Sequence, residues 1–398
     1  MNKRYFIWEN PKQAVFTIMV LLMLIGCINV FSASYVSAQD MFGDGFYYLK
    51  RYVIFGVLGF AAINIVRAIG YKRLLNRKFV WAMYTIVAAM LLLVDFIGEA
   101  NKGAARWLYM GPFSIQPSEF AKPVVIMLAA RYLGVLMKNR ITPGLFQKDC
   151  SGMLMATAFY SVLVLKQPDL GTAAIIVALM MGMMIIGGVS MLQVWGIIAG
   201  GAVCAVAATV TSPYRLDRIK VWLDPWLDEA GNGYQMVQSL LAIGSGGLTG
   251  TQWGLGAGKF FYLPESHTDF AFAIFCQENG FIGAVVLLVL FALLAGAFFR
   301  IASGAKEERG FMLASGITFL VIGQAAANMA MACGLLPVIG VPLIFISYGG
   351  SSMLVSMAAI GMLISVYDAE ERREREEAVP PEERRSGLQL VGSRRWRR

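Results

Sequence analysis

Long apolar runs constrain this chain more than any other feature, because about 18–20 consecutive apolar residues are enough to cross a bilayer as a helix. Several runs in the 398-residue sequence exceed that length. A helix satisfies its own backbone hydrogen bonds in lipid, so the sequence predicts an all-α, polytopic membrane protein with about ten transmembrane helices. The predicted spans cover residues 14–36, 51–69, 79–98, 117–137, 151–167, 170–188, 191–211, 269–300, 310–335 and 347–367.

The positions of the basic residues predict how the helices are oriented. Ten spans put both termini on one side, and the segments then assigned to the cytoplasm hold most of the lysines and arginines, as the positive-inside rule requires. We therefore expect a membrane domain at 1–367 with an extracytoplasmic loop at 212–268. A charged cytoplasmic tail at 368–398 is expected to begin as a solvated extension of the last helix.

Composition excludes several classes of protein. The chain is 58% hydrophobic and only 15% charged, which no ordinary soluble domain approaches. Its net charge of +9 lies in short loops and the tail, so we expect contact with membrane lipid and no nucleic-acid partner. The five cysteines have neither disulfide nor metal-ligand spacing, and we interpret them as small apolar residues.

The stretch Lys259–Phe270 lies where the longest polar interval meets a long apolar run. Its Glu265, His267 and Asp269 are therefore expected at a junction between loop and membrane. Partial desolvation raises the basicity of a carboxylate that water can still reach, which suits a catalytic base. The alternative is structural: Thr268 or Asp269 is the N-cap of the following helix. Both interpretations can hold together.

Two further segments place ionisable residues near the outer membrane face. In Lys166–Thr172, a proline and a glycine break the helix and leave Lys166 and Asp169 beside the break, either as a mutually satisfied pair or as functional groups. In Arg106–Lys122, Glu119 and Lys122 share one helix face. They form either a local ion pair or a cation site for an anionic lipid headgroup.

The loop at 212–268 is long enough to indicate a function. It carries the cations Arg215 and Arg218 and the glycine-rich segments 244–250 and 254–258. Glycine clusters beside a lysine, here Lys259, can hold phosphate through backbone N–H groups, although no Walker spacing is present.

The last two spans show a different pattern. Gln324 and Asn328 lie four residues apart on one helix face, which predicts hydrogen bonds between helices. Two prolines within the apolar stretch 334–352 predict a broken segment that is buried in protein.

These motifs together resemble those of the SEDS family of bacterial wall proteins, whose members include FtsW, RodA and SpoVE. The resemblance implies a ten-span fold and peptidoglycan glycosyltransferase activity on lipid II, with Asp269 as the essential carboxylate and a dependence on Glu119, Lys122 and Asp169. It also implies a class B penicillin-binding protein transpeptidase as partner, and the bacterial cytoplasmic (inner) membrane as location. The matching motifs, in the order of the family, are Arg-Trp, Gln-Pro-Ser-Glu-x-x-Lys, Gln-Pro-Asp-Leu-Gly-Thr, Tyr-Leu-Pro-Glu-x-His-Thr-Asp-Phe and Ser-Tyr-Gly-Gly-Ser-Ser.

The sequence departs from the family pattern at two places. Gly256–Lys259 replaces the usual Ser-x-Gln-Lys, and Gln277-Glu278 stands where Glu-Glu is common. The Asp224-Pro-Trp226 motif and the long charged tail resemble the FtsW-like division branch, whereas Leu336–Pro342 resembles the elongation branch. We favour the division branch.

Glycosyl transfer from lipid II needs few protein groups. The diphosphate leaves readily once cations compensate its negative charge, so no second carboxylate of the kind that glycosidases need is required to protonate it. The reaction then needs a base for the acceptor hydroxyl and cations for the diphosphate. Asp269 is the expected base. The expected substrate-binding residues are Arg106, Glu119, Lys122, Asp169, Arg215, Arg218, Lys259, Glu265 and His267.

No metal-binding cluster or organic cofactor is predicted from the sequence. A divalent cation, Mg or Mn, is expected only as a companion of the substrate diphosphate. Two other functions stay open: a lipid II flippase, with Asn64, Asp95, Gln324 and Asn328 lining a path, and a non-catalytic scaffold for the transpeptidase.

Overall fold

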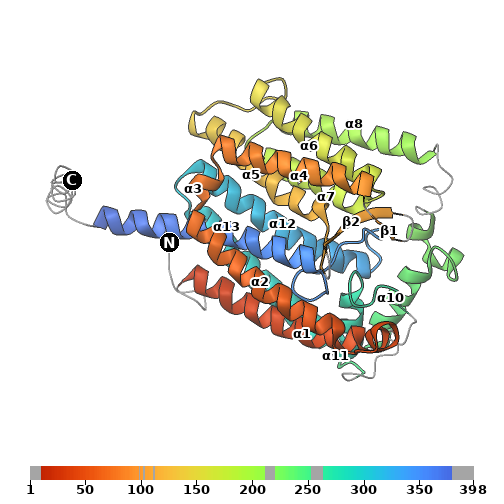
Figure 1. Cartoon of the computed structure of the whole chain (residues 1–398). Helices are drawn as coiled ribbons and strands as arrows, with labels where there is room; N and C mark the ends of the chain where they lie inside the picture. The colour runs from red at the N-terminus through yellow and green to blue at the C-terminus, as the bar shows by residue number, and fades with distance from the viewer. Residues whose placement is uncertain are drawn as a thin grey trace.

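The structure of the protein is a computed structural model that describes residues 10–97, 99–101, 104–110, 113–210, 220–251 and 263–378. Each of the ten predicted spans coincides with a helix, and these helices run roughly alongside one another (Figure 1). They are α1 (Pro11–Phe42), α2 (Tyr47–Ile69), α4 (Arg77–Ile97), α5 (Pro117–Lys138), α6 (Lys148–Lys166), α7 (Leu170–Ile186), α8 (Met191–Val210), α11 (Ala271–Gly304), α12 (Glu308–Ala332) and α13 (Gly350–Ala378). Shorter helices are α3 (Tyr71–Leu74), the 3₁₀ helix η2 (Pro225–Asp228) and α10 (Tyr234–Ser245).

Length and apolar composition identify membrane-spanning helices directly. Within the described residues, seven helices are long and apolar enough to cross a bilayer: α1, α2, α4, α5, α11, α12 and α13. Two shorter apolar helices, α7 and the first part of α8, accompany them. The chain is therefore an integral membrane protein, and the number of ten crossings stays a prediction.

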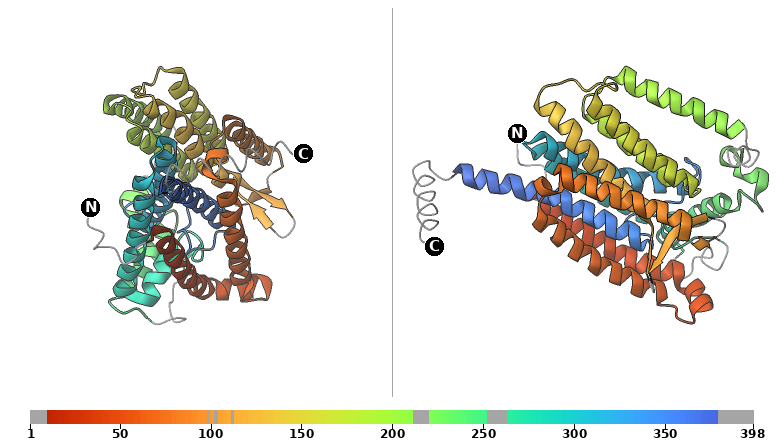
Figure 2. Two further views of the ribbon diagram at one scale, coloured as in Figure 1. Left: turned by 90° about the vertical axis from the view of Figure 1, so that its left-hand side faces the viewer. Right: turned by 45° about the horizontal axis from the view of Figure 1, so that its top comes forward.

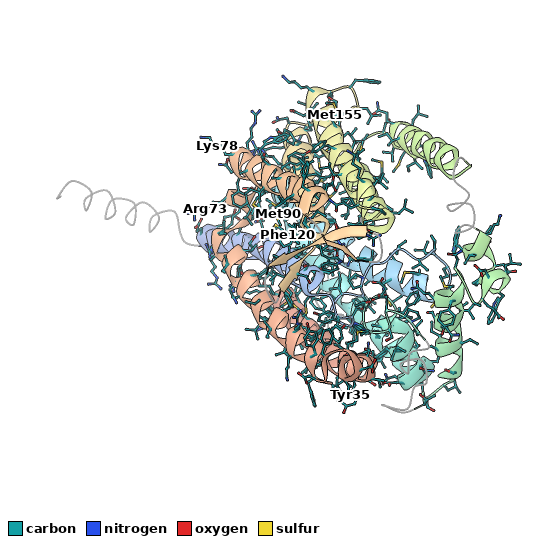
Figure 3. The ribbon with its side chains drawn as sticks, turned by 45° about the vertical axis from the view of Figure 1, so that its right-hand side comes forward. Tyr35, Arg73, Lys78, Met90, Phe120 and Met155 are labelled. Atoms are coloured by element: carbon teal, nitrogen blue, oxygen red, sulfur yellow. The ribbon has the colours of Figure 1, made fainter. Side chains whose placement is uncertain are left out.

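The two ends of the bundle differ in what they carry. The first turn of α1 and α3 lie at one end, which we call the α3 end, and α13 leaves the bundle at this end and extends beyond it (Figures 1 and 2). Arg73 and Lys78 mark this end (Figure 3). The opposite end, which we call the sheet end, carries α10 and a three-stranded sheet. The shared position of the two helix termini agrees with an even number of crossings.

The sheet is a departure from the expected all-helical chain. Strands β1 (Glu99–Asn101), β2 (Ala104–Met110) and β3 (Phe113–Ile115) form an antiparallel sheet in the order β1-β2-β3 between α4 and α5. In its register Leu108 pairs with Ile115. Two strands of three residues carry no readable alternation, so periodicity could not reveal them.

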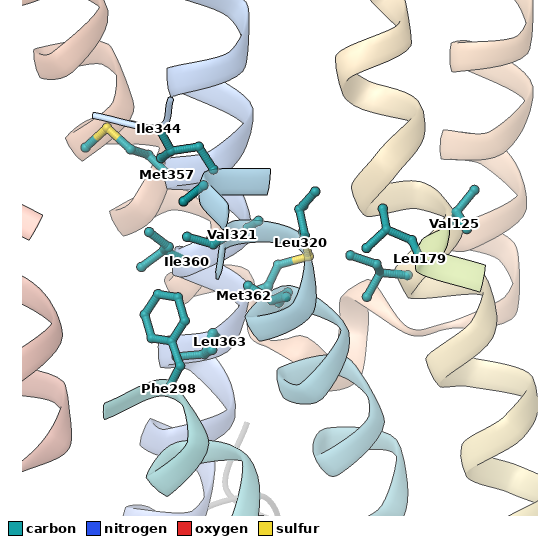
Figure 4. Packing of buried hydrophobic residues seen from close by; sticks show 14 of the residues in the cluster. Val125, Leu179, Phe298, Leu320, Val321, Ile344, Met357, Ile360, Met362 and Leu363 are labelled. Carbon is teal, nitrogen blue, oxygen red and sulfur yellow. The ribbon is translucent and has the colours of Figure 1, made fainter. Parts of the chain in front are cut away.

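The core surrounds α13, which lies in the middle of the bundle between α2, α11 and α12 (Figure 2). Figure 4 shows part of this core, in which Met357 and Leu363 of α13 belong to the same buried cluster as Phe298 of α11 and Val321 of α12. A Cβ on Gly361 of α13 would lie 2.9 Å from backbone atoms of Ile63 in α2. Small residues let membrane helices approach this closely.

Helix α11 is broken near its start. Gly280 has φ 64° and ψ −168°, and the backbone N–H groups of Phe281 and Ile282 donate to Gly247 O at 2.9 Å and Leu248 O at 3.1 Å. Gly250 lies against the same break, where a Cβ would be 2.1 Å from Glu278 O. Gly246 and Gly250 thus pack against the helix break, whereas nothing lies within 4 Å of the Cβ positions of Gly244 and Gly247. A phosphate cradle in this segment stays a prediction.

Candidate active site

Asp269 lies in a turn that precedes α11. The backbone N–H groups of Thr268 and Phe270 both donate to Glu265 O, at 3.2 Å each. Phe270 is the N-cap of α11 and makes no side-chain capping bond, so the prediction that Thr268 or Asp269 caps this helix is wrong. The Thr268 hydroxyl instead donates to Glu265 Oε2 at 3.0 Å, so the Glu265 carboxylate stabilises the turn.

The backbone of Asp269 is held by α12. Asn328 Nδ2 donates to Asp269 O and to Val341 O, at 2.7 Å each. The Asp269 carboxylate faces the segment that contains Val341, because a Cβ placed on Gly340 would lie 3.6 Å from Asp269 Oδ2. The side chain is half-buried, so the carboxylate is at the boundary between protein and solvent.

Residues 333–349, which link α12 to α13, form the broken segment that the two prolines predict. Its Leu343–Ile346 stretch is buried. Two helices and the Asp269 turn hold it: Gln324 Nε2 of α12 donates to Pro342 O at 3.3 Å, Tyr52 Oη of α2 donates to Phe345 O at 2.5 Å, and Tyr348 N donates to His267 O at 2.8 Å. Phe345 has φ 68°, a strained conformation for a residue with a side chain.

The His267 ring packs against aromatic residues. Its centroid lies 4.3 Å from the Tyr48 ring and 6.1 Å from the Tyr348 ring. Burial raises the pKa of the Tyr348 phenol, and a hydrogen bond with Arg51 partly opposes this shift. Sequence reasoning did not single out Tyr48 or Arg51, although their place at the outer end of the second span was the available signal.

Lys122 and Glu119 form the ion pair that their spacing predicts. Lys122 Nζ lies 2.7 Å from Glu119 Oε1 and donates to Gln324 Oε1 at 2.9 Å. Gln324 Nε2 in turn donates to the Ser352 hydroxyl at 3.2 Å. The side chains of Lys122 and Glu119 are 1% and 4% exposed. The pair therefore lies inside the protein, and contact of Lys122 with a lipid headgroup stays a prediction.

Asp169 lies in a second polar cluster. It is the N-cap of α7, and its Oδ1 accepts from Thr172 N at 3.1 Å. Its Oδ2 accepts from Gln116 Nε2 at 3.1 Å and from the Ser118 hydroxyl at 3.4 Å. Lys166 is exposed whereas Asp169 is buried, and no ion pair joins them. Of the two alternatives for Lys166 and Asp169, the mutually satisfied pair is therefore wrong, because the helix terminus and two neutral side chains satisfy the carboxylate instead.

Arg106 lies over the turn that precedes Asp169. Its Nε donates to Gln167 O at 3.1 Å, and its Nη2 donates to Pro168 O. A guanidinium has five N–H donors, so these two bonds leave others available. The remaining predicted cations, Arg215, Arg218 and Lys259, lie outside the described residues.

The broken segment brings these groups together at the sheet end. A Cβ on Gly171 of α7 would lie 1.7 Å from Ile339 O, so the start of α7 touches the segment beside Gly340. Gln324 and Asn328 are one turn apart on α12, a rise of about 6 Å. The buried ammonium of Lys122 and the backbone of Asp269 thus attach to successive turns of one helix. The half-buried carboxylate of Asp269 and the buried Glu119–Lys122 pair are thus connected through one face of α12.

The described residues offer little to hold a metal on their own. Among them, no group of three or more His, Cys, Asp or Glu side chains lies close enough together to bind one. A divalent cation would therefore need ligands from a substrate, such as diphosphate oxygens.

The fold and this site define a helical integral membrane protein with a polar, carboxylate-bearing centre at one end of its bundle. A family model described as the cell cycle protein FtsW/RodA/SpoVE matches residues 12–372. The chain belongs to this family, which confirms the resemblance drawn from its motifs.

Similar proteins extend over nearly the whole chain. Stage V sporulation protein E of Bacillus subtilis (strain 168) is 36% identical over 357 residues, which are 90% of this chain and 97% of that protein. A probable peptidoglycan glycosyltransferase FtsW of Geobacter sp. (strain M18) is 37% identical over 366 residues, with shares of 90% and 97%. These names support the FtsW-like branch.

Solved structures share the fold. A chain from a study of polymerization and crosslinking by a peptidoglycan synthase complex gives a TM-score of 0.74 at 24% identity, covering 89% of this chain and 97% of that one. The rod shape determining protein RodA of Thermus thermophilus gives 0.65 at 24% identity, with 89% and 96% covered.

The contact between Gly171 and Ile339 gives a stability prediction. We expect Gly171→Ala to lower the free energy of unfolding by about 1–3 kcal/mol, because the new methyl group meets a backbone oxygen that must move. Gly200→Ala in α8 is the control, since nothing lies within 4 Å of its Cβ position. Melting in detergent measures both variants, and equal melting temperatures would show that the two segments do not pack this closely.

Proposed function

We propose that this protein is a peptidoglycan glycosyltransferase that polymerises lipid II into glycan strands for cell division or elongation. The observation that carries the proposal is the half-buried Asp269 carboxylate, which faces Gly340 and belongs to a residue whose backbone oxygen accepts a hydrogen bond from Asn328. Family membership and relatives named peptidoglycan glycosyltransferase support it. The reaction takes place at the outer face of the bacterial cytoplasmic membrane, because the basic α3 end belongs in the cytoplasm.

Asp269 is the general base. The acceptor sugar hydroxyl attacks the anomeric carbon of the donor, and its proton passes to the Asp269 carboxylate. The bond from that carbon to the diphosphate breaks, and the electron pair leaves with the diphosphate. This leaving group needs charge compensation more than it needs an acid.

Arg106 is proposed to bind the diphosphate, since its two bonds to carbonyls leave further N–H donors. Arg215, Arg218 and Lys259 are proposed to assist it from the loop. Lys122 is 1% exposed and already donates to Glu119 and Gln324, so its first proposed role is to support the site by holding these two side chains. A divalent cation, Mg²⁺ or Mn²⁺, would be held mainly by diphosphate oxygens and would offset their charge.

The partner is proposed to be a class B penicillin-binding protein, a transpeptidase that crosslinks the glycan product. The similarity to a chain from a peptidoglycan synthase complex supports this assignment.

The domain division also stays a proposal: a membrane domain at 1–367, its extracytoplasmic loop at 212–268 and a tail at 368–398.

A lipid II flippase would need polar side chains along a path through the membrane. Asn64 is exposed on α2 and donates to Phe60 O of its own helix at 2.9 Å, and Asp95 is exposed on α4. Gln324 and Asn328 instead bind the broken segment. These four residues do not line one path, which favours the enzyme over the flippase.

Purified protein with its transpeptidase partner should polymerise lipid II into glycan chains that are visible on a gel. The assay should be run with Mg²⁺, Mn²⁺ and chelator, and a liposome assay should follow lipid II flipping by the same preparation. Polymer without flipping is the expected result. Flipping without polymer, from a folded complex under every metal condition, would replace the enzyme with the flippase.

A further inference from the structure

The α3 end contains a cavity that the proposed reaction does not use. It has a volume of about 260 Å³ and lies between the end of α2, α3 and the last part of α13. Its lining includes four cations, Arg67, Lys72, Arg73 and Arg372, and a single acid, Asp368. The end of α2 and α3, which line the cavity, lie at the end of the bundle opposite to the start of α11, which Asp269 precedes (Figure 1).

The charges around the cavity are only partly balanced. Asp368 is bound by Arg67 and also by Lys12, whose Nζ lies 2.7 Å from its Oδ1. Lys72 is paired with Glu307 at 2.5 Å. Arg73 and Arg372 are exposed, and the described part of the chain gives neither of them an ion pair or a side-chain hydrogen bond. Two guanidinium groups thus face one cavity whose only acid is already bound to two cations.

The surface beside the cavity is apolar. Ile69 lines the cavity and Ile65 lies one turn earlier on α2, and these side chains are 36% and 61% exposed. A soluble anion would gain nothing from them, whereas the acyl chain of a lipid would cover them. Basic pockets between membrane helices on the cytoplasmic side are suited to anionic headgroups.

We propose that this cavity binds the phosphate of an anionic phospholipid from the cytoplasmic leaflet, with Arg73 and Arg372 as its main ligands and the acyl chains along α2. Guanidinium groups can bind phosphate oxygens in a bidentate manner. The site is separate from the glycosyltransferase centre, so it stands whether or not the protein polymerises lipid II.

Binding of dioleoyl phosphatidylglycerol to the purified full-length protein in mixed micelles tests the proposal. Dioleoyl phosphatidylcholine is the zwitterionic comparison, and glycerol 3-phosphate and inorganic phosphate are the soluble anions. We expect tighter binding of phosphatidylglycerol than of phosphatidylcholine, with a salt dependence. The double variant Arg73→Gln/Arg372→Gln should weaken it by about thirtyfold, since each cation near a membrane contributes on the order of 1 kcal/mol.

The control Lys78→Gln/Arg375→Gln removes the same charge from exposed residues at the same end that do not line the cavity. It should bind phosphatidylglycerol like wild type, and Arg73→Lys/Arg372→Lys should restore part of the affinity. Equal weakening by the two glutamine variants would overturn the proposal in favour of general surface charge. Binding of the soluble anions as tightly as the lipid would overturn the lipid assignment, and so would equal affinity of wild type for the two lipids.

Discussion

Replacing Asp269 with asparagine is expected to slow glycan polymerisation by about 10²–10⁴-fold, the usual contribution of a positioned general base. The substitution is nearly isosteric, but an amide cannot accept the proton of the acceptor hydroxyl. The fold should be unaffected. Asn328 binds the backbone carbonyl of residue 269, which the change leaves in place, and Phe270 is the N-cap of α11. Single-turnover polymerisation in one membrane preparation is the measurement.

Glu265→Gln is the matched control, because it changes a neighbouring carboxylate in the same turn by the same chemistry. Its side-chain oxygen can still accept from Thr268, so the turn should persist. We expect this variant to keep most of its activity, and lipid II binding to survive in both variants. Near wild-type polymerisation by Asp269→Asn would remove the base from the proposed mechanism. Equal losses in the two variants would point to the turn and not to one carboxylate.

The helices and the position of Asp269 could be predicted because each depends on local sequence. Apolar runs fix the helices, and a polar-to-apolar junction places Asp269 at the end of the bundle. The cap assignment was wrong because several residues before a helix can serve as N-cap, and here the turn closed on Glu265 shifts the position to Phe270. The order of residues at a junction does not determine which of them closes the turn.

The partners of the buried polar groups could not be predicted, since they are distant in sequence. Lys122 and Gln324 are 202 residues apart, and the Ser32 hydroxyl donates to Glu278 over a separation of 246 residues. A single sequence shows that each residue needs a partner in the membrane but not which helix supplies it. The pair Glu119–Lys122 was predictable because both residues lie on one face of α5.

The break in α11 had a signal that the prediction did not use. The predicted span 269–300 would be about 48 Å long as one helix, which exceeds the roughly 30 Å of the hydrocarbon core. The excess indicates a kink or an extension, and Gly280 is where the structure has it. Residues 246–251 of the preceding loop form the hydrogen bonds that the broken helix lacks at this point. Which segment supplies these bonds depends on the tertiary fold.

Lys122→Met is expected to destabilise the protein by about 3–5 kcal/mol, the usual cost of leaving one partner of a buried ion pair uncompensated. The stem of the side chain is kept, but Glu119 loses its cation at 4% exposure, and Gln324 Oε1 loses a donor. Melting in detergent should therefore fall clearly. Glu119→Gln should also destabilise, but less, because Lys122 keeps Gln324 as a partner.

The double variant Lys122→Met/Glu119→Gln distinguishes two roles of Lys122, structural support of the site and direct contact with the substrate, because it removes both buried charges together. We expect its melting temperature to recover relative to Lys122→Met, since no unpaired charge is left inside the bundle. Activity then decides the role of the lysine. If Lys122 only supports the site through Glu119 and Gln324, polymerisation should recover along with stability. If the ammonium binds the diphosphate, stability should return without activity. An unchanged melting temperature in Lys122→Met would show instead that the ion pair does not stabilise the fold.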